Sequence, residues 1–195
     1  VISSLNTHNG KVIVGTQNAY GASNGAFTGE IGSVHLDEFG IKTILIGHSE
    51  RRHILGEMQE ELVKKFNFYK KLGFKIVYCV GEPLEVREAG FEYMMEYISK
   101  QYAGIDTSYE NLIIAYEPVW AIGTGLTPTK EDIATLHKEL KKKSSAPLLY
   151  GGSVKVNNAK EVLSTEAVDG VLVGGAALNV EDFCTMCEIA QGLSG

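Results

Sequence analysis

The stretch Leu112-Ile113-Ile114-Ala115-Tyr116-Glu117-Pro118 places a carboxylate directly after a continuous apolar run. A run without polar alternation is typical of a strand buried on both faces, as in a parallel sheet covered by helices. In parallel α/β folds, the functional groups gather at the carboxyl ends of the strands. The stretch therefore predicts a parallel α/β fold, with Glu117 as a candidate functional residue.

Similar apolar runs occur before and after this stretch, and we interpret each as a buried strand. They are Lys11–Gly15, Thr43–Gly47, Ile76–Val80, Pro147–Tyr150 and Val171–Val173. Amphipathic patterns between them predict helices over Glu60–Leu72, Gly90–Gln101 and Lys130–Lys143. This alternation gives six strand-helix units, which fit a doubly wound open sheet as well as a barrel.

Length, composition and net charge limit the kind of protein that this chain can be. The chain has 195 residues, of which 44% are hydrophobic and 22% are charged, which predicts a single globular domain over residues 1–195. We find no apolar run long enough for a membrane span and no secretory leader, so we expect a cytoplasmic protein. The net charge of −6 argues against nucleic-acid or membrane partners, and any anionic ligand must be bound by local groups.

A second candidate group follows the run Thr43–Gly47. There the chain continues as His48-Ser49-Glu50-Arg51-Arg52, so an imidazole lies at a strand end, as Glu117 does. A lone histidine is more often a hydrogen-bonded structural residue, but this position favours a functional role. The other histidines are interpreted as surface residues; they are His8, His35, His53 and His137.

The segment after Glu117 predicts a mobile lid. It runs Pro118-Val119-Trp120-Ala121-Ile122-Gly123-Thr124-Gly125 and combines glycine hinges with apolar side chains that a loop normally does not expose. The alternative is a buried ion pair at Glu117 followed by an anchored surface loop.

Two glycine pairs follow the last two runs, in Tyr150-Gly151-Gly152-Ser153 and Gly174-Gly175-Ala176-Ala177. Glycines let backbone N–H groups approach a ligand closely, and a helix N-terminus behind them favours an anion, so the pairs predict a phosphate site. One pair alone would equally fit a tight turn.

Other chemistries have little support. No His, Asp or Glu cluster has metal-ligand spacing, and we interpret Cys184-Thr185-Met186-Cys187 as packing on a C-terminal helix rather than as a zinc or redox site. We find no dinucleotide fingerprint and no P-loop, and we expect no cofactor. A carboxylate base, an imidazole and a phosphate cradle suit metal-free proton transfer on a small phosphorylated carbonyl compound.

The segments quoted above around His48, around Glu117 and at the two glycine pairs closely resemble the triosephosphate isomerase family in sequence and in order. The segment Gly25-Ala26-Phe27-Thr28-Gly29-Glu30, which precedes them, resembles the same family. The resemblance implies a TIM (β/α)8-type barrel, of which this chain shows family units 3 to 8. It implies that the family's first strand, first helix and second strand are absent, with the Asn and Lys which that first strand contributes to the site. Val1–Gly10 is interpreted instead as a helix end and a turn.

The resemblance also implies the activity, which is the interconversion of dihydroxyacetone phosphate and glyceraldehyde 3-phosphate in glycolysis and gluconeogenesis. It makes Glu117 the catalytic base and His48 the electrophile, with Ser49, Glu50 and Cys79 in support. Gly123, Ser153, Gly174 and Gly175 match the phosphate contacts. The tip Phe27-Thr28-Gly29 matches a loop that enters a second subunit, which implies a homodimer. Leu126 stands where the family usually has Lys.

Two other functions remain open at this point. A shortened homologue with weak or no activity could serve as a phosphate-binding or self-assembling protein, since open sheet edges tend to pair with other chains. Another phosphate-binding barrel enzyme, such as an epimerase, is disfavoured by the lack of metal ligands.

Overall fold

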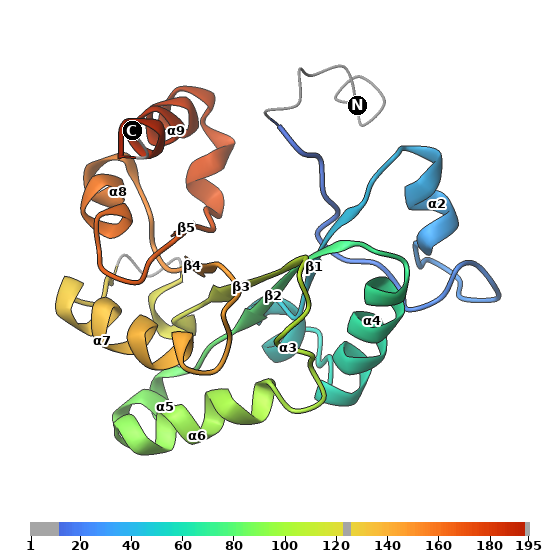
Figure 1. Ribbon diagram of the computed structural model, residues 1–195, viewed down its shortest axis with the longest axis horizontal. Coiled ribbons are helices and arrows are strands. Elements are labelled where there is room, and N and C mark those ends of the chain that lie inside the picture. Colours follow the sequence, from blue (N-terminus) through green and yellow to red (C-terminus); the bar gives the residue numbers. More distant parts are fainter. Residues whose placement is uncertain (1–11, 123–125, 194–195) are drawn as a thin grey trace.

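A computed structural model describes residues 12–122 and 126–193, and within these ranges the strands form one parallel sheet (Figure 1). The sheet has five strands, which follow one another in chain order. Their bounds are β1 Thr43–Ile46, β2 Lys75–Val80, β3 Leu112–Tyr116, β4 Leu148–Tyr150 and β5 Gly170–Val171. The parallel α/β prediction from the apolar runs is therefore confirmed.

The register of the sheet brings the carboxyl ends of neighbouring strands together. Ile46 of β1 lies opposite Tyr78, and Tyr116 of β3 lies between Val80 of β2 and Tyr150 of β4. The residues that follow these strands therefore emerge at one edge of the sheet. This is the edge where the sequence places His48, Glu117 and the Gly151-Gly152 pair.

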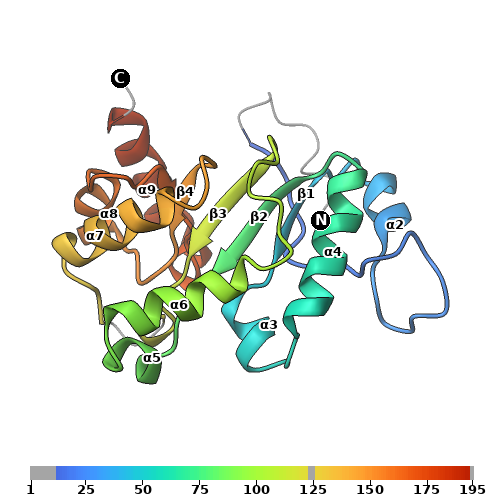
Figure 2. The same ribbon diagram turned by 60° about the horizontal axis from the view of Figure 1, so that its bottom comes forward.

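Helices connect the strands, and α4, α6 and α7 lie along one side of the sheet (Figures 1 and 2). The helices of the described part are α2 Ser33–Glu38, α3 Ser49–His53, α4 Gln59–Lys71, α5 Leu84–Glu88, α6 Phe91–Gln101, α7 Lys130–Lys141, α8 Val156–Leu163 and α9 Val180–Leu193, with 3₁₀ turns η1 Val119–Ala121 and η2 Gly175–Leu178. The three predicted helices agree with α4, α6 and α7 to within two residues at each end. None of the helices in these ranges is long and apolar enough to cross a bilayer.

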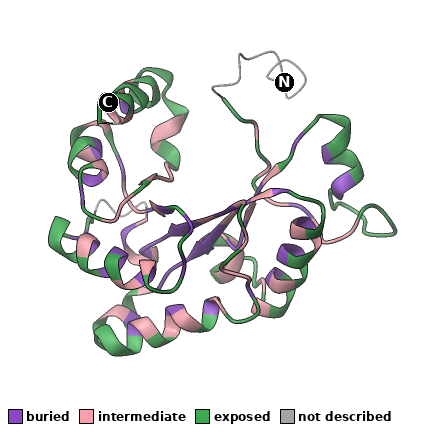
Figure 3. Ribbon diagram, in the orientation of Figure 1, coloured by how far each residue is buried: buried purple, intermediate pink, exposed green. Residues whose placement is uncertain are grey.

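The core lies between the sheet and these helices, where buried residues concentrate in the strands and on the inner helix faces (Figure 3). Leu62, Phe66 and Tyr69 of α4 are fully buried against the sheet, at the helical spacing that a core-facing stripe requires. The sheet is thereby a rigid base for the loops at its carboxyl edge.

The predicted strand over Lys11–Gly15 is wrong within its described part, residues 12–15. The segment pairs with β1 through a single bridge, Thr16 with Ile44, and Val12 and Ile13 are more than 60% exposed. An apolar run becomes a buried strand only where other elements cover both of its faces, and no described element covers Val12 and Ile13. The interpretation of Val1–Gly10 falls outside the described residues.

The expectation that His137 is a surface residue is also wrong. His137 is fully buried on the inner face of α7, and its ring contacts those of Tyr116 and Tyr150. Burial lowers the pKa of His137 to about 4, so the ring is neutral near pH 7. The apolar neighbours Ile133, Leu136 and Leu140 share this face, and that spacing could have identified it.

The Cys184–Cys187 segment lies on a C-terminal helix, as predicted, but it does not pack as expected. Both cysteines are exposed on α9, and Met186 between them is the buried residue. The thiols are therefore on the outer face of α9 in the described part of the chain.

Candidate active site

A tight turn at the end of β1 places His48. Gly47 has φ +77°, in the left-handed region that favours glycine, and a side chain there would meet the guanidinium of Arg52 at 2.8 Å. Arg52 in turn donates from Nε to the Gly47 carbonyl at 2.8 Å. This hydrogen bond holds the turn in place. His48, the next residue, is the N-cap of α3.

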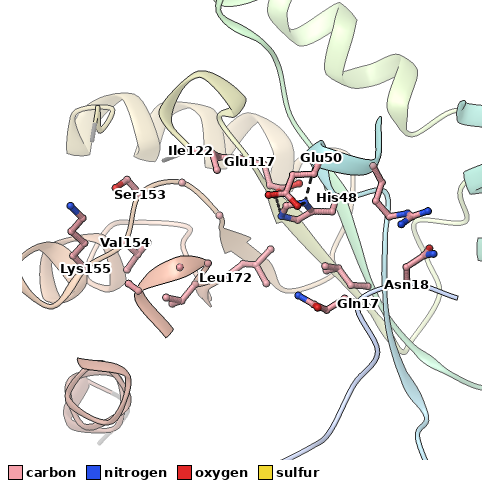
Figure 4. Close-up of a pocket in the computed structure, with 18 of the residues that line it drawn as sticks. Gln17, Asn18, His48, Glu50, Glu117, Ile122, Ser153, Val154, Lys155 and Leu172 are labelled. Carbon is pink, nitrogen blue, oxygen red and sulfur yellow. Dashed lines mark hydrogen bonds and ion pairs between the residues drawn. The ribbon is translucent and has the colours of Figure 1, made fainter. Parts of the chain in front are cut away.

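His48 and Glu117 contact each other directly (Figure 4). Nε2 of His48 lies 2.9 Å from Oε1 of Glu117, and Nδ1 accepts a hydrogen bond from the backbone N–H of Glu50 at 3.3 Å. Because Nδ1 accepts, the proton of the neutral ring lies on Nε2. The hydrogen bond to Glu117 raises the pKa of His48, partial burial opposes this, and the charges of Glu117 and Glu50 add to the rise.

Glu117 is 2% exposed and is held by groups from other strand ends. The backbone N–H of Ser49 donates to Oε2 at 2.9 Å, and the Ser49 hydroxyl lies 3.4 Å from Oε1. Cys79 is buried beside the carboxylate, and burial together with Glu117 raises the pKa of its thiol well above the ordinary value. A thiol in this state is a poor nucleophile, which fits a supporting role.

The backbone of Glu117 is packed as closely as its side chain. A Cβ added at Gly81 would lie 1.8 Å from the Glu117 carbonyl oxygen, so the position has no room for any other residue. The Glu117 N–H donates to the Val80 carbonyl at 2.8 Å. Contacts between the ends of β2 and β3 therefore fix the position of the Glu117 backbone, from which the carboxylate side chain extends.

His48 and Glu117 line a pocket of about 450 Å³ at the carboxyl edge of the sheet. His48, Glu50 and Glu117 lie at one end, and Ser153 lies across the pocket from them (Figure 4). The remaining lining includes both predicted glycine pairs, Gly151, Gly152, Gly174 and Gly175. The structure thus brings the predicted carboxylate, imidazole and phosphate cradle into one pocket.

The base of the predicted lid is anchored by a buried carboxylate. Trp120 donates from Nε1 to Oε1 of Glu82 at 3.0 Å, and the Tyr116 hydroxyl donates to the same oxygen at 3.0 Å. Glu82 is fully buried, and burial raises its pKa even though these hydrogen bonds oppose the rise. Arg87 stacks 4.7 Å from the centre of the Trp120 ring.

Pro118–Ile122 is the part of the lid that the structure describes, and Ile122 lines the pocket. The predicted phosphate contact Gly123 and the lid residues Thr124 and Gly125 lie outside the described residues. The loop tip Phe27-Thr28-Gly29 does not line the pocket. It is exposed, with Phe27 stacked on Tyr20 at 4.4 Å between ring centres.

Sequence reasoning missed several residues of this region. Gln17 and Asn18 line the pocket and follow the Thr16 bridge, so the strand-end rule that found His48 could have found them. The same rule applied to β2 points to Glu82. Arg51 and Lys155 also line the pocket, next to residues that were predicted.

Comparison with known proteins identifies the family. A family model described as triosephosphate isomerase matches residues 1–190. A triosephosphate isomerase of Sulfurimonas denitrificans is 72% identical over 192 residues, which are 98% of this chain and 80% of that protein. Proteins with the same name from a Sulfurovum species and from Wolinella succinogenes are 58% and 56% identical, and the matches cover 94% and 92% of this chain and 80% and 77% of those proteins.

The five parallel strands and the helices of the described part are consistent with a TIM-barrel-type fold, which the family match supports over the doubly wound alternative. With the strand-end pocket, the family match and the identities above, the chain belongs to the triosephosphate isomerase family.

Proposed function

We propose that this chain interconverts dihydroxyacetone phosphate and glyceraldehyde 3-phosphate, with Glu117 as the base and His48 as the electrophile. The observation that carries the proposal is the 2.9 Å contact between His48 Nε2 and Glu117 Oε1, at one end of a pocket whose other side carries Ser153 and the glycine pairs. Family membership and the names of the relatives support the same reaction.

The two groups divide the chemistry between them. The Glu117 carboxylate removes a proton from the carbon next to the carbonyl and returns it to the neighbouring carbon. The Nε2–H of His48 donates to the carbonyl oxygen as negative charge develops there, which stabilises the enediolate. The imidazole then carries a proton from the neighbouring hydroxyl oxygen to the former carbonyl oxygen, so that the enediolate collapses to the isomeric hydroxycarbonyl compound. Glu117 and His48 contact each other directly, so the substrate must bind between the two side chains. It would replace their mutual contact by one contact with Glu117 and one with His48.

The surrounding residues then have supporting roles. Ser49 holds the carboxylate, Cys79 packs beside it, and Glu50 fixes the ring tautomer through its backbone N–H. Backbone N–H groups at Ser153, Gly174, Gly175 and Gly123 would bind the phosphate. Of these residues, Gly175 begins the 3₁₀ turn η2, whose first N–H groups have no partner within the turn. The segment Pro118–Gly125 would close over the substrate and exclude water.

The alternative of an inactive phosphate-binding homologue is not favoured. A protein that only bound phosphate would have no need for a buried carboxylate in contact with an imidazole at the far end of the pocket. The relatives that match 92–98% of this chain are named as isomerases.

A coupled assay of triose phosphate isomerisation tests the proposal on the parent chain, Glu117→Gln and His48→Gln. We expect each substitution to lower kcat by about 10²-fold or more, because it removes a group that acts in the transition state. Both substitutions roughly keep the size of the side chain, so we expect both variants to fold. Circular dichroism checks this. A parent chain that turns over no faster than Glu117→Gln would refute the proposed activity.

We further propose a cytoplasmic homodimer that works in glycolysis and gluconeogenesis, as the resemblance implies. The exposed tip Phe27-Thr28-Gly29 would enter the partner, and Phe27 is 42% exposed in the single chain. Sedimentation of the parent and of Phe27→Ser checks this. We expect a dimer that the substitution weakens, and a monomeric parent at micromolar concentration would contradict it.

A further inference from the structure

The charged residues that line the pocket leave one cation without an acidic partner. Arg51 is paired, because its NH2 group lies 2.7 Å from Oε1 of Glu57. Glu50 and Glu117 are acidic, and His48 is bound to Glu117. Among the described residues, no ion pair or side-chain hydrogen bond involves the ammonium of the remaining charged residue, Lys155.

Lys155 lies next to Ser153 at the end of the pocket away from Glu117 (Figure 4). It is exposed, and it directly precedes α8, whose N-terminus adds partial positive charge on the same side. In Figure 4 its side chain extends outward beside Ser153 rather than toward His48. The ammonium therefore lies at the exposed rim of the pocket, on the Ser153 side.

Such a cation matters in this chain because the rest of the molecule repels the substrate. The net charge is −6, and the pocket itself contains two carboxylates, Glu50 and Glu117. A fixed positive charge at the mouth of a cleft raises the local concentration of an anion and its rate of association, and salt weakens the effect.

From this arrangement we propose that Lys155 is a substrate-steering residue, which draws the phosphate group toward the Ser153 side of the pocket. The inference rests on the proposed function for its substrate and adds a residue that none of the assigned roles includes. Lys155 contributes charge to the encounter and takes no part in proton transfer.

A charge series at this position tests the inference, with Lys155→Arg, Lys155→Gln and Lys155→Glu. We expect kcat/KM at low salt to be unchanged in the arginine variant, to fall about threefold in the glutamine variant and to fall about tenfold in the glutamate variant, with kcat constant. The differences should fade as NaCl is raised above about 0.2 M.

Lys160 provides the matched control. It lies exposed on the same helix, α8, but does not line the pocket. Lys160→Gln and Lys160→Glu change the net charge equally and should leave kcat/KM within about twofold of the parent. An equal loss at both positions would mean that net charge acts rather than the place of Lys155, and an unchanged Lys155→Glu variant would overturn the inference.

Binding of inorganic phosphate separates this inference from the proposed function, because it needs no turnover. Phosphate is titrated into the parent, Lys155→Gln, Lys155→Glu and Lys160→Glu, and followed by chemical shifts of the glycine N–H groups in the pocket. We expect the affinity for phosphate to fall from the parent to Lys155→Gln and further to Lys155→Glu. Lys160→Glu should bind phosphate as the parent does. If the parent has no isomerase activity but phosphate affinity still falls from Lys to Gln to Glu at position 155, the proposed activity is refuted and the attraction of phosphate by Lys155 is supported. If all variants bind phosphate equally, the role of Lys155 is refuted and the proposed activity is not affected.

Discussion

At the scale of single residues, the His48–Glu117 contact ties the protonation of one group to the other. The hydrogen bond from Glu117 is the largest cause of the raised His48 pKa. Glu117→Gln should therefore lower the pKa of His48, as measured by NMR titration of the ring, with His48→Gln assigning its signal among the five histidines. An unchanged pKa would show that the two side chains do not interact in solution.

The same contact gives stability a defined pH dependence. Because the folded pKa of His48 is raised above about 6.5, its contribution is fully present below pH 6.5 and is lost as the pH rises through the folded value. In Glu117→Gln this loss should be smaller when urea unfolding is followed from pH 6 to pH 9. Equal slopes in the parent and the variant would contradict the assignment.

Gly81 is the residue where backbone packing has the clearest consequence. Gly81→Ala would place a Cβ 1.8 Å from the Glu117 carbonyl oxygen, so the strand end that carries the base must shift. We expect kcat/KM to fall by at least about tenfold and the free energy of unfolding to fall by about 1–3 kcal/mol. Gly192→Ala, where a Cβ meets nothing within 4 Å, is the control and should retain parental activity.

At the scale of elements, Glu82 joins the end of β2 to the lid base. Glu82→Leu removes the acceptor that Trp120 and Tyr116 share, and we expect it to lower the free energy of unfolding by about 2–4 kcal/mol. Glu82→Gln keeps an acceptor and should cost about 1 kcal/mol or less. Urea unfolding measures both changes, and since Trp120 is the chain's single tryptophan, its fluorescence also reports the lid base. Equal stabilities would mean that the shared acceptor is unimportant.

The elements also show what sequence patterns can and cannot predict. Apolar runs located β1 to β4, and the run Val171–Val173 overlapped β5 at its last residue, because a two-sided core selects β-branched and aliphatic residues wherever it forms. The same pattern failed at Val12 and Ile13, since a run does not say whether other elements cover it. Glu117 and His48 were found by the strand-end rule, while Glu82 was missed although it follows β2 in the same way.

At the scale of the whole molecule, the sheet acts as a frame that brings distant sequence positions to one edge. Ser49 and Glu117 are 68 residues apart, yet a parallel register places the Ser49 N–H 2.9 Å from the carboxylate. Distances of this kind depend on the turn at Gly47 and on the close backbone packing at Gly81, which sequence periodicity does not describe. The arrangement of the pocket therefore follows from the fold, and the identity of its groups follows from the sequence.

His137 gives the molecule as a whole a predictable weakness toward acid. Its folded pKa is about 4 against about 6.5 when unfolded, so below pH 6.5 the unfolded chain binds a proton that the folded chain does not. Stability should fall as the pH drops from 6.5 to 4, by at most about 3.5 kcal/mol for a shift of about 2.5 pK units at about 1.4 kcal/mol each. Urea unfolding of the parent and of His137→Gln across this range measures the effect.

The comparison between these two chains isolates His137 from other groups that titrate in the same range. Glu82, whose pKa is raised by burial, acts in the opposite direction, because its folded form takes up a proton as the pH falls. That contribution is present in both chains and cancels in the difference. His137→Gln should be less stable at pH 7, because it loses ring contacts with Tyr116 and Tyr150, and should decline less steeply toward pH 4. Parallel declines would show that the buried ring does not control acid stability.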